Sequence, residues 1–590
     1  MNIIGISSHF HDSACALLKD GKLVAAVAEE RFSRFKNDSR LPVRSFRYCL
    51  EEANLSIKDI DYIGFYESPE KKLSRQLQYP FASESDNEYR WLDYDLPIRE
   101  IREILGYENV IRTYDHHLSH AATAFYFSGF KESAIFICDG VGEWDTTSYW
   151  VGFGSKIELL HNEIFPNSVG LLYSTLTNFL GFKVLNGEYK VMGLAPYGVP
   201  KYSEHIRKLF CCDEEGNFCL NMEYFDFANA KKMFKDSLSV LLGVPPRRKE
   251  SDITQEYLNI AASLQQVLEE ILVKKIKYLA SIAGKKNLCL SGGVALNCVA
   301  VNSIRKTGFF ERIYIPSSPG DSGAATGVAA LAYIDATNKR HSYEKLETAY
   351  FGPSYSNNYI KDLLDSIEIK YNDYSNNEDS FCNSVIKEIL EGKVIGFFQG
   401  RMEFGPRALG NRSIIADPRL SSMRDKLNNL VKKREAFRPF APIILEEHFS
   451  DIIELSEPCY FMSEVCKVIS KLDLPAITHV DKTCRPQTIN SKSNYILHKI
   501  MTKFFKITGC PVLVNTSFNV RGEPIVCSPI DALRCFGNSG IEVLAMGRMI
   551  IKKEFLTDKF IEMAIHEHEY IKPGKDLFTK KVSDSVYTFI

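Results

Sequence analysis

One supersecondary pattern occurs twice in the first third of the chain. It consists of a strand, a polar loop and a β-hairpin, and it covers residues 2–28 and again residues 133–161. Short apolar runs separated by turn residues are typical of strands. The repeat predicts two similar lobes that face a cleft, each with a loop of Asp or Ser and Gly. We expect phosphate or metal to bind between these lobes.

Composition narrows the class of protein. At about 100–200 residues per domain, 590 residues are too many for one ordinary core. Lys+Arg of 72 against Asp+Glu of 74 gives a net charge of −2, which offers no positive field to nucleic acid or to a membrane. The 15 cysteines form no C-x-x-C pair. We therefore expect a cytoplasmic protein that acts on small substrates, with no zinc ribbon, disulfide framework, signal peptide or membrane span.

A long helix and two glycine turns follow the second repeat. Apolar spacing predicts a helix over Glu256–Ile282, and a short strand follows it at Asn287–Leu290. The first glycine turn contains Gly292, Gly293 and Asn297, and the second contains Gly320 and opens a helix that ends near Ile334. Together with the repeat, these turns fit a nucleotide cleft. No P-loop or well-placed G-x-G-x-x-G sequence is present.

A polar stretch divides the chain. Polar residues gather over Asn338–Glu347, and we place the domain boundary there, giving domains 1–345 and 346–590. The second domain resumes with a helix over Phe381–Leu390 and a strand over Lys393–Phe398, which indicates an α/β domain. The tail after Asp558 shows little patterning and is expected to be a solvated surface segment.

His116 and His120 have the spacing of a metal-binding pair. They are four residues apart in a segment of helical composition, so both imidazoles can project from one helix face. Histidines that only form hydrogen bonds at a buried surface are an equal alternative for this pair alone. Asp139 follows an apolar strand and Asp321 lies at a glycine turn, and two imidazoles with two carboxylates suit a divalent first-row metal. The sequence H-E-x-x-H of zinc proteases is missing.

Basic residues gather in the second domain. Arg401, Arg407, Arg412 and Arg419 are followed by Lys432, Lys433, Arg434 and Arg438, with Phe404, Phe437 and Phe440 among them. Solvated surface is one interpretation. Burying a guanidinium without an anion is costly, so phosphate recognition is the sharper hypothesis. Ser517 and Asn519 follow a strand and could bind the same oxyanion, although alone they are ordinary turn residues.

Several long motifs resemble one enzyme family, the NodU/CmcH-type O-carbamoyltransferases. In the second domain the motifs are Gly400–Ser413, Arg434–Pro442 and Asn515–Asn519. In the first domain they are Glu29–Arg34, His116–Ala121, Gly187–Ala195 and Ser291–Asn297. The resemblance covers nearly the whole chain.

The resemblance implies a fold and a two-step reaction. The fold is α/β, with an N-terminal domain of the actin/Hsp70/sugar-kinase type, built of duplicated RNase H-like lobes, and a C-terminal YrdC-like domain. The YrdC-like domain would form carbamoyl-adenylate from ATP and carbamoyl phosphate. The N-terminal domain would transfer the carbamoyl group to the hydroxyl of a small-molecule acceptor such as a natural product or sugar. A homodimer is compatible with the sequence, which does not set the oligomeric state.

The resemblance also assigns residues. The carbamoyl phosphate and adenylate site would contain Arg407, Lys432, Arg434, Arg438, Arg485, Ser517 and Asn519, with Lys432 and Arg407 acting in catalysis. The metal, with iron expected, would be bound by His116, His120, Asp139 and Asp321, while Mg²⁺ would accompany ATP. His11 is the candidate general base. The acceptor surface is expected within residues 200–248.

Two departures and two alternatives accompany this hypothesis. Ser13 is shifted by one position from the family pattern, and Lys482 and Cys484 replace usual glycines. One alternative is a tRNA threonylcarbamoyl transferase, which the near-neutral charge disfavours. The other is a nucleotide-gated scaffold of the actin/Hsp70 type, which needs neither the paired histidines nor the arginine pocket.

Overall fold

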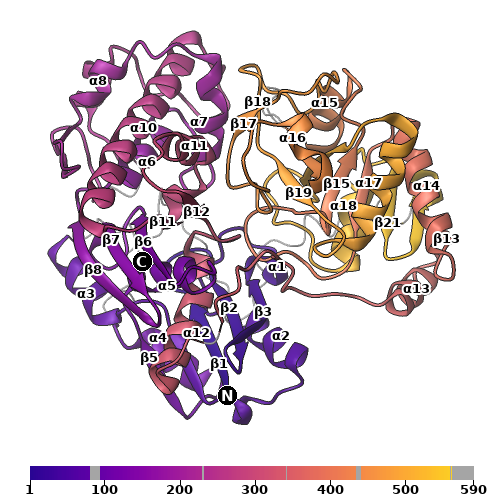
Figure 1. Cartoon of the computed structure of the whole chain (residues 1–590), viewed down its shortest axis with the longest axis horizontal. Coiled ribbons are helices and arrows are strands. Elements are labelled where there is room, and N and C mark those ends of the chain that lie inside the picture. Colours follow the sequence, from indigo (N-terminus) through magenta and orange to yellow (C-terminus); the bar gives the residue numbers. More distant parts are fainter. Residues whose placement is uncertain (80–92, 229–231, 341, 433–439, 558–559, 561–590) are drawn as a thin grey trace. The chain divides into compact units, whose positions relative to one another are not determined.

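Two units make up the part of the chain that the structure, a computed structural model, describes. The described residues are 1–79, 93–228, 232–340, 342–432, 440–557 and 560. Met1–Ser33 and Asn37–Leu346 form the first unit (Figure 1). The second contains the described residues between 347 and 560 together with Arg34–Lys36.

The first unit contains two five-stranded sheets of the same topology. One has the order β3-β2-β1-β4-β5, from the strands β1 (Asn2–Ser7), β2 (Ala14–Lys19), β3 (Lys22–Ala28), β4 (Tyr62–Phe65) and β5 (Val110–Thr113). The other has the order β12-β11-β6-β7-β8, from β6 (Glu132–Cys138), β7 (Asp145–Phe153), β8 (Lys156–Ile164), β11 (Asn287–Ser291) and β12 (Arg312–Tyr314).

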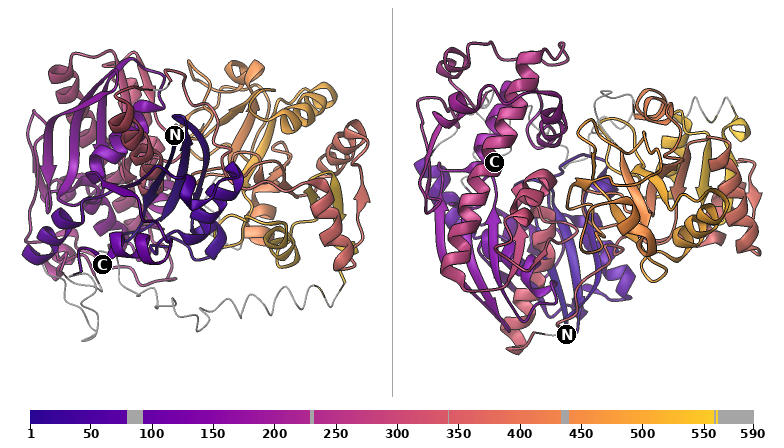
Figure 2. Two further views of the ribbon diagram at one scale, coloured as in Figure 1. Left: turned by 90° about the horizontal axis from the view of Figure 1, so that it is seen from below. Right: turned by 45° about the horizontal axis from the view of Figure 1, so that its top comes forward.

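In each sheet a three-stranded antiparallel meander is extended by two parallel strands. The indigo strands of the first sheet and the purple strands β6–β8 of the second are seen from two further sides in Figure 2. The predicted actin/Hsp70/sugar-kinase-like fold of duplicated lobes is therefore confirmed.

Two helices fill the space between these sheets. Helix α12 (Asp321–Thr337) packs on β1, β2 and β4, helix α5 (His116–Tyr126) packs on β6 and β11, and the two helices pack on each other. Glycines allow this close approach: a Cβ on Gly327 would meet the carbonyl oxygen of Ser119 at 2.0 Å, and one on Gly5 would meet that of Ala325 at 1.9 Å.

The predicted long helix is α10 (Gln255–Ala283), which ends at Gly284 in a left-handed conformation. Its Lys275 is fully buried, and the ammonium group binds the carboxylate of Glu163 and the carbonyl oxygen of Gly216. The other elements of the unit are α1 (Glu30–Ser33), α2 (Val43–Ala53), α3 (Pro69–Gln78), α4 (Leu96–Glu103), α6 (Val169–Phe179), α7 (Glu188–Leu194), α8 (Ser203–Arg207), β9 (Phe210–Cys212), β10 (Phe218–Leu220), α9 (Asp236–Leu242) and α11 (Cys298–Lys306).

The second unit is built on one mixed sheet of eight strands. Its order is β13-β22-β21-β14-β15-β20-β16-β19, with bounds β13 (Asn372–Asp373), β14 (Ile395–Phe398), β15 (Arg412–Ala416), β16 (Ala441–Leu445), β19 (Gln487–Ile489), β20 (Val512–Ser517), β21 (Val543–Met546) and β22 (Met549–Lys552). A separate ribbon is formed by β17 (Cys466–Lys467) and β18 (Thr483–Cys484).

Helices of the second unit complete an α/β fold. They are α13 (Asn357–Ser366), α14 (Glu378–Leu390), α15 (Met423–Lys426), α16 (Phe449–Ile452), α17 (Tyr495–Thr508) and α18 (Pro529–Gly537). The predicted helix and strand at the start of this unit correspond to α14 and β14. Its likeness to YrdC stays a prediction. Within the described ranges, no helix of either unit is long and apolar enough to cross a membrane.

Candidate metal centre

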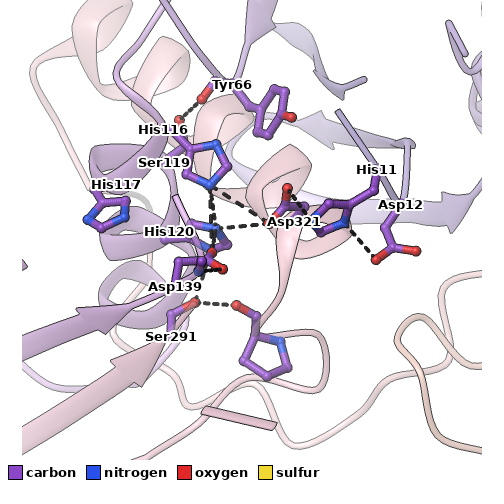
Figure 3. Close-up of polar contacts among 12 residues, drawn as sticks. His11, Asp12, Tyr66, His116, His117, Ser119, His120, Asp139, Ser291 and Asp321 are labelled. Atoms are coloured by element: carbon purple, nitrogen blue, oxygen red, sulfur yellow. Dashed lines mark hydrogen bonds and ion pairs between the residues drawn. The ribbon is translucent and has the colours of Figure 1, made fainter. Parts of the chain in front are cut away.

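Four buried side chains meet in the first unit (Figure 3). His116 and His120 lie one turn apart on α5, Asp139 directly follows β6, and Asp321 is the first residue of α12. One ligand atom of each residue lies within 4.8 Å of the others. The packing of α5 on α12 therefore brings together four groups that are up to 205 positions apart along the chain, 321 − 116 = 205.

The donor set fits a divalent cation. The Nε2 atoms of His116 and His120 face each other at 3.1 Å, so they cannot both carry a proton, and at least one presents a lone pair to the centre. His120 Nε2 lies 3.2 Å from Asp139 Oδ2 and 3.5 Å from Asp321 Oδ1. Two imidazoles and two carboxylates, all buried, are a common ligand set for first-row metals.

Further polar groups orient these ligands. Ser291 Oγ lies 3.3 Å from His120 Nδ1, and it donates to the carbonyl oxygen of Pro319 at 2.8 Å. The backbone N–H of Gly140 donates to Asp139 Oδ1 at 2.7 Å. Such outer partners fix the direction of metal ligands and tune their affinity.

The cluster shifts the pKa values of its members. Burial would raise the pKa of Asp139, but the imidazoles of His116 and His120 hold it well below its usual range. Burial would lower the pKa of His120, but Asp139 and Asp321 outweigh burial and raise it to about 9. Both pKa shifts arise because a positive imidazolium lies beside negative carboxylates. A bound cation would supply this positive charge instead.

His11 lies at the edge of this centre. Its Nδ1 is 3.0 Å from Asp12 Oδ2, and its Nε2 is 3.5 Å from Asp321 Oδ2. Burial would lower the pKa of His11, but the carboxylates of Asp321 and Asp12 raise it to about 10. A cation bound to Asp321 would compensate that negative charge and lower the pKa of His11 again. The predicted general base therefore lies beside a predicted metal ligand.

Three of the four predicted nucleotide-binding residues border the same centre. Gly292 has φ 90° and approaches β6 so closely that a Cβ would meet the carbonyl oxygen of Cys138 at 2.4 Å. A Cβ on Gly293 would meet Asp139 Oδ1 at 2.9 Å, and Gly320 immediately precedes Asp321.

The fourth, Asn297, is engaged within the fold. Its side chain caps α11 by accepting from the backbone N–H of Ala300, and it pairs with the amide of Gln265. These contacts show a structural function, and nucleotide binding by Asn297 stays a prediction.

In the second unit, four predicted residues lie on connected segments. The Asn515 side chain donates to the carbonyl oxygen of Ala408 at 3.0 Å and to Gln487 Oε1 at 2.9 Å. Ala408, Gln487 and Asn515 are one or two positions from Arg407, Arg485 and Ser517. The hydroxyl of Ser517 donates to Asn519 Oδ1 at 2.7 Å. Lys432 ends the segment Leu427–Lys432, whose last side chain is not described, and Arg434 and Arg438 lie outside the described residues.

Other arginines of the predicted basic cluster serve the fold itself. Arg412 is fully buried and donates to the carbonyl oxygens of Gln399 and Pro353, with its guanidinium 3.7 Å from the centre of the Phe398 ring. Arg401 donates to the carbonyl oxygens of Phe351 and Gly352, and Arg419 binds Asp417. These cations satisfy backbone and carboxylate oxygens.

The loop that carries Arg407 is shaped by a residue that the sequence analysis did not single out. Glu403 Oε1 accepts from the backbone N–H groups of Leu409, Asn411 and Arg412, at 2.7, 2.8 and 3.2 Å. The only feature of the sequence that could have pointed to Glu403 is its position inside the long motif Gly400–Ser413.

Comparison with known protein families matches the two halves of this chain to two family models. Family models described as Carbamoyltransferase N-terminus and Carbamoyltransferase C-terminus match residues 2–331 and 386–553. The chain is thus an enzyme that transfers carbamoyl groups, and it belongs to the carbamoyltransferase family.

Three relatives illustrate the similarity. Uncharacterized protein sll1178 of Synechocystis is 42% identical, covering 94% of this chain and 97% of the relative. Nodulation protein NolNO of Sinorhizobium fredii is 37% identical, covering 93% of this chain and 80% of the relative. Nodulation protein U of Rhizobium tropici is 28% identical, covering 89% of this chain and 92% of the relative.

Proposed function

We propose that this carbamoyltransferase works in two half-reactions on a small-molecule hydroxyl. In the first, carbamoyl phosphate, water and ATP give carbamoyl-adenylate, phosphate and pyrophosphate. In the second, the acceptor oxygen attacks the carbamoyl carbon and AMP leaves. The observation that carries the proposal is the buried centre of two histidines and two aspartates with His11 beside it, in a chain of this family.

The first unit would perform the transfer. His116, His120, Asp139 and Asp321 would hold a divalent metal, for which iron is our expectation, and the bound ion would supply Lewis-acid polarisation of the carbamoyl oxygen. His11 would accept the proton of the acceptor hydroxyl. The turns with Gly292, Gly293, Asn297 and Gly320 would contact the nucleotide, and residues 200–248 the acceptor.

The second unit would form the adenylate. Arg407, Arg485, Ser517 and Asn519, with Lys432, Arg434 and Arg438, would bind carbamoyl phosphate and stabilise the charge that develops during adenylate formation. Mg²⁺ would accompany ATP. The net charge of −2 gives no support to the alternative of a tRNA substrate, because phosphate backbones bind to basic surfaces.

The test is a direct assay of both half-reactions. The protein is incubated with ATP, carbamoyl phosphate and a panel of sugars and hydroxylated natural products, pyrophosphate release is followed, and products are searched by mass for a carbamoyl adduct. Lys432→Ala should abolish pyrophosphate release without changing metal content, whereas His116→Ala should strip the metal and stop transfer. Wild-type protein that releases no pyrophosphate and carbamoylates nothing would refute the proposal.

A further inference from the structure

A buried phenol lies at the metal centre without a partner. Tyr66 is fully buried, and its hydroxyl makes no hydrogen bond to any residue that the structure describes. Its ring centre lies 5.1 Å from that of His116. In Figure 3 the hydroxyl lies on the side of the centre where Asp321 and His11 are drawn. A buried polar group without a partner in a folded protein calls for an explanation.

The strand register explains where this side chain points. Tyr66 follows β4, and its backbone N–H still donates to the carbonyl oxygen of Ile6 on β1, so the strand geometry continues to Tyr66. Side chains two positions apart share one face of a strand, so Tyr66 faces the same side as Gly64. That side is covered by α12, because a Cβ on Gly64 would meet Val328 at 2.9 Å. Helix α12 begins at Asp321, so the phenol lies on the same side of the sheet as Asp321, beside the centre (Figure 3).

Three serine hydroxyls at this end of the sheet are also buried and unpaired among the described residues. Ser7 and Ser8 at the end of β1, and Ser13 just before β2, are buried, and their hydroxyls form no hydrogen bond within the described part of the chain. Four unpaired hydroxyls at the ends of three neighbouring strands indicate a polar ligand that supplies the missing partners.

We propose that Tyr66 is a catalytic residue of the carbamoyl-transfer step, donating a hydrogen bond from its hydroxyl to the carbamoyl oxygen. The inference rests on the proposed function. A phenol is protonated at neutral pH. The charged groups that act on it are the carboxylates of Glu67, Asp321, Glu143 and Asp139, which accept hydrogen bonds and cannot bind the carbamoyl oxygen themselves.

The hydrogen bond would be strongest in the transition state. As the acceptor oxygen adds to the carbamoyl carbon, the C=O π electrons move to the carbamoyl oxygen, which becomes more negative. When the C=O bond re-forms, the C–O bond to AMP breaks. Tyr66 keeps its proton throughout, so the donor is preorganised for charge that develops only during reaction.

Tyr66→Phe tests the proposal because the substitution should preserve the stability of the protein but slow carbamoyl transfer. Removing an unpaired hydroxyl should leave the melting temperature at or above that of the wild type. Metal content and pyrophosphate release should be unchanged. The kcat of transfer should fall by about 10²–10³-fold, the usual effect of losing one oxyanion donor. Transfer is measured with the acceptor that the screen identifies, or with excess glycerol as a simple alcohol.

Tyr107→Phe is the matched control. Tyr107 is a buried tyrosine of the same lobe, but its hydroxyl donates to the carbonyl oxygens of Val110 and Ile60, at 3.3 and 3.5 Å. Its loss should lower the melting temperature slightly and leave transfer unchanged. Full transfer by Tyr66→Phe, or an equal loss of pyrophosphate release and transfer, would overturn the assignment. A wild-type enzyme without transfer would instead refute the proposed function.

Discussion

Both carboxylate oxygens of Glu143 accept a hydrogen bond from the backbone N–H of His116, at 3.0 and 3.1 Å. His116 is the first residue of α5, where backbone N–H groups have no partner within the helix. The same carboxylate accepts from the backbone N–H of Ser68 at 2.6 Å. Glu143 therefore fixes the start of the helix that carries both histidines of the candidate metal centre, and burial raises its pKa to about 7.

Glu143→Ala is expected to weaken metal binding without removing a ligand. Loss of the carboxylate frees the first turn of α5, and the loss of an outer partner typically lowers metal affinity by about 10–100-fold. Glu143→Gln keeps one acceptor oxygen and should lie between this variant and the wild type. Metal titration of the three proteins gives the comparison, and equal affinity of Glu143→Ala and the wild type would show that Glu143 does not position the histidines.

Much of the first unit could be predicted because its signals are local. Apolar runs and turn residues define β1–β3 and β6–β8 to within a few positions, and the repeat they form implies the second sheet from the first. The His116 and His120 pair is visible because four-residue spacing on a helix is enough to place two side chains together. Asp139 and Asp321 join the predicted set because one follows an apolar strand and the other lies at a glycine turn, and the fold brings all four side chains together.

The remainder depends on contacts between distant segments. Glu143 lies in the loop between β6 and β7, and from the sequence alone it resembles a surface carboxylate; only the fold places it at the start of α5. Arg412 looked like a phosphate ligand, yet its partner Pro353 is 59 positions away. Tyr66 gives no signal in sequence, because an unpaired hydroxyl is recognisable only when all its neighbours are placed.

Gly292→Ala is expected to damage the metal centre, whereas Gly284→Ala is not. Both glycines have positive φ; a residue with a Cβ costs about 1–2 kcal/mol in the left-handed helical conformation of Gly284, and more at Gly292, whose φ of 90° and ψ of 162° are adopted almost only by glycine. Only at Gly292 would the new Cβ also meet backbone, at 2.4 Å from the carbonyl oxygen of Cys138, next to Asp139. A Cβ on Gly284 would meet no atom of the other described residues within 4 Å. Metal content and melting temperature are measured together, and normal metal content in Gly292→Ala would show that the turn can shift without moving Asp139.

Lys275→Met is expected to destabilise the first unit by about 3–5 kcal/mol, because it leaves the buried carboxylate of Glu163 without its cation. In the double variant with Glu163→Gln the uncompensated charge is removed while an oxygen remains to accept from the backbone N–H of Phe218. The double variant should therefore recover part of the loss. Calorimetry compares the single and double variants, and a double variant less stable than Lys275→Met would show that the charge is not the cause.

His11→Asn is expected to separate the two half-reactions. The imidazole is needed only when the acceptor hydroxyl attacks, because adenylate formation involves no alcohol. Asparagine keeps a polar side chain of similar reach beside Asp12 and Asp321, so the centre should still assemble. Pyrophosphate release and metal content should match the wild type, while transfer falls by about 10²–10⁴-fold, the usual range for general-base catalysis.

The control for His11→Asn is His117→Asn, at a histidine one position from the predicted metal ligand His116. His117 binds Ser148 Oγ at 2.7 Å, and burial lowers its pKa, so it is neutral and turned toward β7. This variant should lose stability through the broken hydrogen bond but retain transfer in the protein that remains folded. Equal losses of pyrophosphate release and transfer in His11→Asn would assign His11 to nucleotide binding or to the structure of the centre, because a general base for the acceptor cannot affect a reaction that lacks the acceptor.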